Sequence, residues 1–228
     1  MNITTIKHFF IGIFLTNKYG LKLKKVSTNA QKKELRVAYA KDQLNALNIK
    51  VKVLNPQKIP QDGQYLLVSN HKSIIDPPII ELALEDSNIF GLWISKKELY
   101  NNPFFGIFVR NAGSVLVDRD KKSMGGFFKD IKKGVESGCS IFIFPEGTRN
   151  KTEQPIGEFK EGYRLISLKN RLPILPIYIK TDARVALQNA LKDDKTPQII
   201  EVELGDIIDY RSKDDLSSKY KEMFKIEG

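Results

Sequence analysis

The sequence predicts one α/β domain with a largely parallel, about seven-stranded sheet flanked by helices, preceded by an N-terminal amphipathic two-helix segment. The chain has 228 residues, of which 41% are hydrophobic, enough for one domain with a sizeable core. Short apolar runs alternate with helical patterns, as expected for a parallel sheet, because each parallel crossover needs a helix-sized connection. The sequence contains no internal repeat and no low-complexity linker.

Each predicted strand is a short run of aliphatic, β-branched or aromatic residues. These runs lie at residues 51–54, 65–69, 89–94, 113–117, 140–144, 174–179 and 198–204. Helical spacing of apolar residues predicts helices at residues 77–84, 123–137 and 159–169. Residues that directly follow the strands are therefore expected at the carboxyl edge of the sheet, where open α/β sheets build their sites.

Positive charge is concentrated before and within the first predicted strand. Residues 1–54 carry eleven Lys and Arg against Glu34 and Asp42, a net charge of +9 out of +10 for the whole chain. The first stretch is apolar and aromatic, but its run is shorter than the roughly 20 residues that span a bilayer. The second stretch, from about residue 30 to 48, has an apolar side and an adjoining basic stripe, formed by Val37, Ala40, Leu44 and Leu47 and by Lys32 and Arg36.

These features predict that residues 1–50 form two short interfacial helices, which dock the protein on an anionic membrane surface as a peripheral or monotopic protein. A helical cap on the sheet with solvated lysines is one alternative. A secretory signal peptide is another, although no Ala-x-Ala site follows. Binding of nucleic acid, suggested by a pI of about 9.5, is disfavoured because no known motif appears and the charge lies beside phenylalanines.

The segment NHKSIIDP, residues 70–77, contains the strongest candidate for acid–base chemistry. His71 lies five residues before Asp76, directly after a predicted strand. A neutral imidazole can take a proton from a hydroxyl, provided that another group fixes its tautomer and stabilises the resulting cation. Asp76 could do both. It could equally be a simple helix cap, so the pair needs support from other segments.

Three further strand ends supply that support. FPEGTRN, residues 144–150, follows a strand with Glu146, Gly147, Thr148 and Arg149, a mixture that suits an anion because Arg offers a planar fork of donors and Gly allows close backbone approach. GSVLVDR, residues 113–119, ends in Asp118 and Arg119. LPILPIYIK, residues 172–180, is a strand with two prolines.

In this order and spacing, the four segments resemble the sequence blocks of the glycerolipid acyltransferases, in particular the 1-acyl-glycerol-3-phosphate acyltransferases. WISKKEL, residues 93–99, followed by NPFFG, resembles the stretch between the first two blocks. The resemblance covers residues 51 to about 180 and implies an acyltransferase catalytic domain over residues 51–228. The implied reaction transfers a fatty acyl chain from a thioester of acyl carrier protein or coenzyme A to the hydroxyl of a lysophosphatidic acid.

The resemblance also implies roles for individual residues. His71 is the expected general base, oriented by Asp76. Glu146 and Arg149, with Arg119, match the block that binds the acceptor phosphate, with Glu146 expected to position an arginine or a glycerol hydroxyl. We expect Lys96 and the backbone amide of Gly147 or a neighbour to stabilise the thioester oxygen as charge develops. Thr148 belongs to the same substrate-binding segment.

The sequence argues against other chemistries. The single cysteine, Cys139, opens a predicted strand and is interpreted as a small core residue. Ser73 has no second histidine to activate it, and no Gly-x-Ser-x-Gly occurs. Two histidines without a Cys pair predict no metal site, and no P-loop or dinucleotide motif predicts a cofactor.

Several functional alternatives stay open at this point. The acceptor could be another lysophospholipid or glycerol 3-phosphate, and the fold could serve a non-catalytic, peripheral lipid-binding protein. The expected location is the cytoplasmic face of the cell membrane. The sequence predicts neither the acyl chain length nor the donor carrier.

Overall fold

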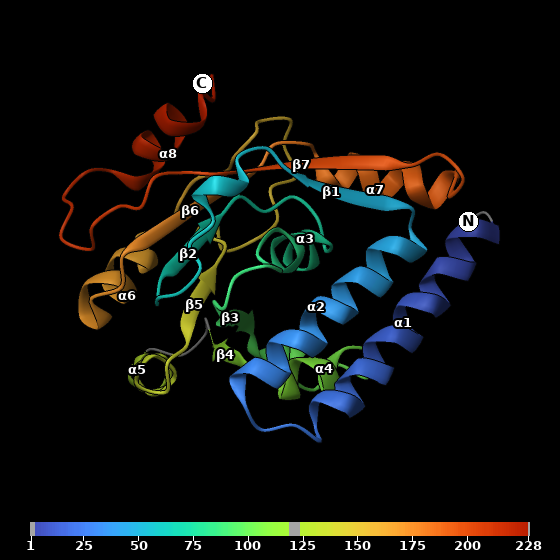
Figure 1. Cartoon of the computed structure of the whole chain (residues 1–228), viewed down its shortest axis with the longest axis horizontal. Coiled ribbons are helices and arrows are strands. Elements are labelled where there is room, and N and C mark those ends of the chain that lie inside the picture. The colour runs from blue at the N-terminus through green and yellow to red at the C-terminus, as the bar shows by residue number, and fades with distance from the viewer. Residues whose placement is uncertain (1–2, 119–123, 228) are drawn as a thin grey trace.

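The computed structural model describes residues 3–118 and 124–227, and within them seven strands form one sheet (Figure 1). The strand order is β1-β7-β6-β2-β5-β3-β4, and every pair is parallel except β6 with β7. The fold prediction is confirmed. The strands are β1 Ile49–Val53, β2 Leu66–Ser69, β3 Gly91–Lys96, β4 Ser114–Val117, β5 Ser140–Ile143, β6 Ile174–Ile179 and β7 Gln198–Leu204.

Burial follows the position of each strand in the sheet. All four residues of β2 and all six of β6 are buried, because these central strands are covered by helices on both faces. The edge strand β1 instead alternates, with Ile49 buried and Lys50 exposed.

Helices cover both faces of the sheet (Figure 1). One face packs in a core with α2, α3 and α7, and the other with α5, α6 and α8. The predicted helices correspond to α3, α5 and α6, whereas α4, α7 and α8 were not predicted individually. The bounds are α1 Ile3–Leu23, α2 Asn29–Ala46, α3 Asp76–Ala83, α4 Gly106–Asn111, α5 Gly125–Glu136, α6 Gly162–Asn170, α7 Ala183–Lys192 and α8 Leu216–Phe224, with short 3-10 turns at Pro56–Lys58 and Lys97–Leu99.

The two N-terminal helices have 21 and 18 residues, and the second corresponds to the stretch predicted at about residues 30 to 48; the two differ in what they contact. Helix α2 lies against α3 and β1 and contributes Leu44 to the core of the sheet. Helix α1 packs outside it, against α2, α4 and α7. Among the described residues, no helix is both long enough and apolar enough to cross a membrane.

The prediction that Arg36 belongs to an exposed basic stripe of α2 is wrong. Its side chain is buried and forms an ion pair with Glu81, and Nη1 donates to the carbonyl oxygens of Gly91 at 2.6 Å and Ala112 at 3.2 Å. The guanidinium also lies over the ring of Phe90. A buried charge with this many partners fastens α2 to the sheet and is unavailable to a membrane. For α2, the helical-cap alternative therefore describes the arrangement better.

Candidate active site

The loop between β2 and α3 folds around the carboxylate of Asp76. Asp76 is 1% exposed, and its Oδ2 accepts hydrogen bonds from the backbone amides of Lys72 and Ser73, both at 2.7 Å. The same oxygen lies 2.8 Å from Nδ1 of His71. Because Oδ2 acts as the acceptor for all three groups, the His71 proton belongs on Nδ1, which leaves the Nε2 lone pair free. The sequence prediction of a strand-to-helix turn is thus matched by the geometry.

Aromatic packing fixes the plane of the imidazole. The ring of His71 stacks on Phe144 with centroids 4.0 Å apart and an interplanar angle of 9°, and Trp93 stacks on Phe144 in turn at 5.1 Å. Trp93 Nε1 donates to Glu81 at 2.8 Å, so the Trp93 ring is itself held. The side chain of His71 remains 18% exposed, which is enough for contact with a substrate.

Burial and hydrogen bonding act in opposite directions on the carboxyl group of Asp76. Burial raises the pKa of Asp76, while its hydrogen bonds with His71 and two backbone amides favour the ionised form. A proton taken up at Nε2 would create an imidazolium facing this carboxylate. The arrangement can therefore accept and return a proton.

The backbone of His71 is held by the FPEGTRN loop that follows β5. The His71 amide donates to Oε1 of Glu146 at 2.8 Å, and the His71 carbonyl accepts from the Asn150 amide at 2.6 Å. Burial raises the pKa of Glu146 to about 7, against the hydrogen bond from His71, and the charge of Asp76 adds to the rise. Glu146 was expected to face an arginine or a substrate hydroxyl, and it instead bonds the main chain of the histidine.

The tip of the same loop is open to solvent. Thr148 and Arg149 are exposed, whereas Gly147 adopts a φ of 70° that favours glycine. The amide of Gly147 already donates to the Phe144 carbonyl at 2.9 Å. A donor to the thioester oxygen is thus better sought at the neighbouring amides of Thr148 and Arg149, the other option that the sequence left open.

One further predicted site residue, Lys96, lies along the same edge of the sheet. Lys96 ends β3 and is exposed, so it lies at the carboxyl edge of the sheet, as His71 does. Arg119 falls outside the described residues. The structure therefore brings together His71, Asp76 and Glu146, and it leaves the side chains of Lys96 and Arg149 exposed.

Sequence reasoning missed Asn70 and Lys72, the neighbours of His71. Asn70 joins β2 to β6 through Nδ2 to the Ile179 carbonyl at 3.0 Å and through Oδ1 from the Ile179 amide at 2.9 Å. Lys72 pairs with Asp182 at 3.1 Å. Their place in the NHKSIIDP segment was the available signal, but their partners lie 109 and 110 residues away.

Comparison with known proteins agrees with this geometry. Residues 50–180 match the family model described as Acyltransferase. The chain belongs to this acyltransferase family. It is 37% identical over 124 residues to the 1-acyl-sn-glycerol-3-phosphate acyltransferase of Helicobacter pylori (strain J99), covering 54% of this chain and 51% of that protein. It is 31% identical over 124 residues to the enzyme of the same name from Streptococcus pneumoniae (strain R6), covering 54% and 44%.

The chain thus spans about half the length of the curated relatives that it matches. A crystal structure of the 1-acyl-sn-glycerophosphate acyltransferase PlsC from Thermotoga maritima superposes with a TM-score of 0.73 at 20% identity, covering 98% of this chain and 91% of the other. At that identity the likeness supports the fold. The Acyltransferase match includes all four segments of the predicted site.

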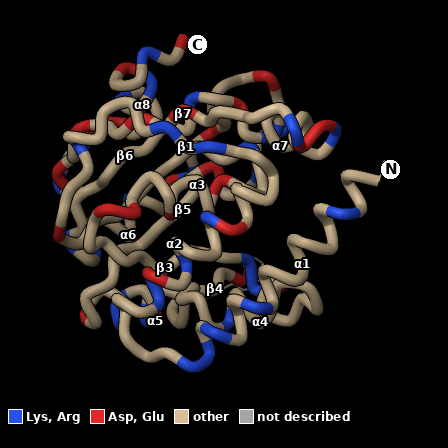
Figure 2. Tube along the Cα trace, turned by 45° about the vertical axis from the view of Figure 1, so that its right-hand side comes forward, with Lys and Arg blue, Asp and Glu red and all other residues tan. Residues whose placement is uncertain are grey.

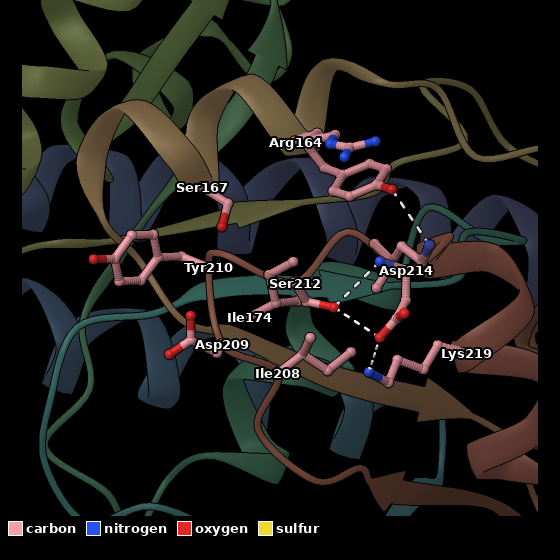
Figure 3. Close-up of a pocket in the computed structure, with 11 residues that line it drawn as sticks. Arg164, Ser167, Ile174, Ile208, Asp209, Tyr210, Ser212, Asp214 and Lys219 are labelled. Atoms are coloured by element: carbon pink, nitrogen blue, oxygen red, sulfur yellow. Dashed lines mark hydrogen bonds and ion pairs between the residues drawn. The ribbon is translucent and has the colours of Figure 1, made fainter.

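Among the hollows in the described part of the acyltransferase domain, two have linings that do not include His71. One, of about 190 Å³, is lined by Asn70, Lys72, Glu153, Pro155, Tyr178, Ile179, Lys180 and Asp182. The other, drawn in Figure 3, has room for about one water molecule and includes Ile174, the first residue of β6. Asn70, the neighbour of His71, bonds Ile179, the last residue of β6. The Figure 3 hollow includes the first residue of β6, so it lies at the amino end of this strand, whereas His71 lies near the carboxyl end.

The remaining side chains of the acyltransferase domain offer no competing chemistry within the described residues. No group of three His, Cys, Asp or Glu there could hold a metal ion. Cys139 is buried, and burial raises the pKa of its thiol, which disfavours a nucleophilic thiolate.

Proposed function

We propose that this acyltransferase transfers a fatty acyl chain from a thioester of acyl carrier protein or coenzyme A to the 2-hydroxyl of 1-acyl-glycerol-3-phosphate, giving phosphatidic acid. The observation that carries the proposal is the 2.8 Å contact between His71 Nδ1 and Asp76, which leaves Nε2 able to accept a proton. The names of the relatives from H. pylori and S. pneumoniae support the choice of acceptor.

The reaction divides into two proton transfers at one nitrogen. Nε2 of His71 takes the proton of the acceptor hydroxyl as the hydroxyl oxygen attacks the thioester carbonyl carbon. The C–S bond then breaks, and the imidazolium returns the proton to the leaving sulfur. Asp76 stabilises the cation between the two steps, and the stack on Phe144 keeps Nε2 directed at the hydroxyl.

Exposed cations at the rim suit the acceptor phosphate. Arg149 is exposed on the tip of the loop after β5, and a guanidinium binds phosphate through paired N–H donors. Thr148, beside it, can add a hydroxyl donor. Arg119 joins this set by its place in the motif. Lys96 and the amides of residues 148 and 149 are our candidates for stabilising the oxyanion.

An apolar face suited to the bilayer adjoins this edge of the sheet. Residues 3–17 of α1 carry Lys7 as their only Lys, Arg, Asp or Glu, with lysines following at 18, 22, 24 and 25 (Figure 2). Phe10 is 63% exposed and Phe14 65% exposed. Exposure of neighbouring large aromatic side chains marks an interaction surface, and flanking lysines make anionic lipid the fitting partner.

The same face continues onto the loop between β3 and α4. The rings of Phe10 and Phe9 lie 5.7 Å apart, those of Phe9 and Phe104 6.2 Å, and those of Phe104 and Phe105 6.4 Å. We call these four residues with Phe14 the docking face. Because the β3–α4 loop follows the carboxyl end of β3, docking would bring the His71 edge toward the cytoplasmic leaflet, where acceptor and product are dissolved.

A donor and acceptor panel tests the proposed reaction. Purified protein is incubated with acyl carrier protein and coenzyme A thioesters against lysophosphatidic acid, other lysophospholipids and glycerol 3-phosphate, and products are identified by mass spectrometry. We expect phosphatidic acid as the main product. Preferred acylation of glycerol 3-phosphate or of another lysolipid would reassign the acceptor, and no product with any pair would point to a non-catalytic lipid-binding protein.

A further inference from the structure

Glu146 differs in burial from the tip of the loop that carries it. It is 5% exposed, whereas Thr148 and Arg149 at the tip of the loop are exposed. Oε1 of Glu146 is already engaged by the His71 amide at 2.8 Å. A carboxylate that is buried and bonded to the main chain is badly placed to bind a substrate hydroxyl, and it would repel a phosphate.

The hydrogen bonds around His71 give this carboxylate a different task. The loop after β5 forms hydrogen bonds with both backbone groups of His71. The His71 amide donates to Glu146, and the His71 carbonyl accepts from the Asn150 amide at 2.6 Å. Residues 147–149 lie between the two residues that make these hydrogen bonds. A movement of the loop tip toward a bound phosphate would therefore be transmitted to the backbone of the histidine.

Gly157 provides the space that the Glu146 carboxylate needs. A Cβ built on Gly157 would meet Oε2 of Glu146 at 2.5 Å, closer than real Cβ atoms approach. Gly157 is not among the described glycines with positive φ, so the requirement is for space and not for an unusual backbone conformation. An alanine at this position would push the carboxylate away while leaving the substrate-facing residues unchanged.

We propose that Glu146 is a positioning residue that sets the catalytic base through the His71 backbone and does not contact the acceptor. The inference rests on the proposed function, in which His71 is the base. Within the described residues, charged or titratable groups from three segments interact with Glu146. They are His71 and Lys72 of the β2–α3 loop, Asp76 of α3 and Tyr220 of α8.

The split between kcat and KM tests the role. Glu146→Gln keeps the shape of the side chain but replaces the charge-assisted hydrogen bond to the His71 amide by a weaker, neutral one. We expect His71 to be held less well, so that kcat falls about ten- to a hundredfold. KM for lysophosphatidic acid should stay within about twofold of the wild-type value. A tenfold rise in KM with kcat retained would overturn the proposal and return Glu146 to substrate binding. Gly157→Ala should reproduce the fall in kcat, and Gly162→Ala, whose Cβ would meet nothing within 4 Å, is the matched control.

Hydrogen exchange of the His71 amide gives a readout that needs no turnover. In substrate-free protein followed by NMR, we expect Glu146→Gln and Gly157→Ala to speed exchange at this amide at least tenfold, while amides of β6 keep their wild-type rates and report intact folding. Unchanged protection of the His71 amide in both variants would contradict the positioning role. If the wild-type protein shows no acyl transfer, the proposed function is contradicted, but the exchange measurement still tests whether Glu146 holds the His71 backbone.

Discussion

The loops that follow β2 and β5 extend from neighbouring parallel strands. They differ in how far their charged side chains are buried and hydrogen-bonded. In the β2 loop, Oδ2 of Asp76 accepts from one side chain and two backbone amides. In the β5 loop, Arg149 is exposed and makes no hydrogen bond or ion pair within the described part of the chain. One loop fixes its charged group in advance, and the other leaves its charged group available.

The difference matches what each task requires physically. Proton transfer needs the imidazole at a set distance and angle, and buried hydrogen bonds supply that order before the substrate arrives. Recognition of a phosphate instead needs an unpaired cation, because a guanidinium already bonded to a carboxylate would have to break that bond first. Glu146 and Asn150 link the two loops by hydrogen bonds to the backbone of His71. Under the proposed function, a phosphate bound at the tip of the β5 loop would therefore affect the position of His71.

The largest effect is expected from His71→Ala. Loss of the base should lower kcat by about a thousandfold or more, since general-base catalysis contributes typically 10² to 10⁴ and no described histidine lies near. Steady-state kinetics measures this, with circular dichroism and vesicle binding as checks on the fold. His8→Ala is the matched control, because His8 lies in α1 and contacts Asp194, which follows α7, outside the loop that carries His71. Near-normal turnover by the His71 variant would remove the mechanism.

A second prediction concerns the docking face, whose residues lie outside both loops. Replacing Phe104 and Phe105 together by serine should weaken binding to anionic vesicles about tenfold or more, since burying an aromatic side chain is worth roughly 1.5 to 3 kcal/mol. Serine at Phe10 and Phe14 should do the same. Sedimentation with vesicles across a salt series measures this, and added salt should weaken binding without abolishing it.

The control for docking lies on the other face of the sheet. Leu165 and Leu168 of α6 are exposed at 49% and 43%, close to the 44% and 42% of Phe104 and Phe105. Serine at these two positions should leave vesicle binding unchanged, and an equal loss would show that general surface hydrophobicity drives it. Point changes serve better than deletion of residues 1–25, because Leu15, Tyr19 and Leu23 of α1 are buried.

The third prediction is a gain of stability from Glu146→Gln. The folded-state pKa of Glu146 is raised to about 7 from 4.5, chiefly by burial. Between these values the folded chain binds a proton that the unfolded chain has lost, so stability falls as pH rises through this window. Above pH 7 the cost is on the order of 3 kcal/mol, and glutamine removes it.

Thermal unfolding at pH 5 and pH 8 checks this prediction. The Tm of the Glu146→Gln variant relative to wild type should rise by several degrees more at pH 8 than at pH 5. A difference that does not grow with pH would mean that the carboxylate is ionised in the fold without penalty. Higher stability with lower turnover is the combination expected for a strained group kept for function.

The sequence predicted the sheet because alternating apolar runs and helical patterns are local signals. The candidate base and its orienting acid were also readable, since His71 and Asp76 lie in one turn. Roles that depend on distant partners were not readable. Arg36 looked like part of a basic stripe, and its partner Glu81 lies 45 residues away. Glu146 looked like a substrate ligand, and its partner His71 lies 75 residues away.

The contrast between the two loops is tested most directly by comparing Asp76→Asn with Arg149→Ala in one assay of kcat and KM for lysophosphatidic acid. The asparagine keeps the shape of Asp76 but loses the charge that stabilises the imidazolium, so kcat should fall about a hundredfold with little change in KM. The Arg149 variant loses a charge-assisted contact worth about 1.5 to 3 kcal/mol, so KM should rise about ten- to a hundredfold for the phosphate-bearing acceptor while KM for the acyl donor is retained. If both variants lose kcat alone, or if KM for donor and acceptor rises equally in the Arg149 variant, the division of labour between the loops is contradicted.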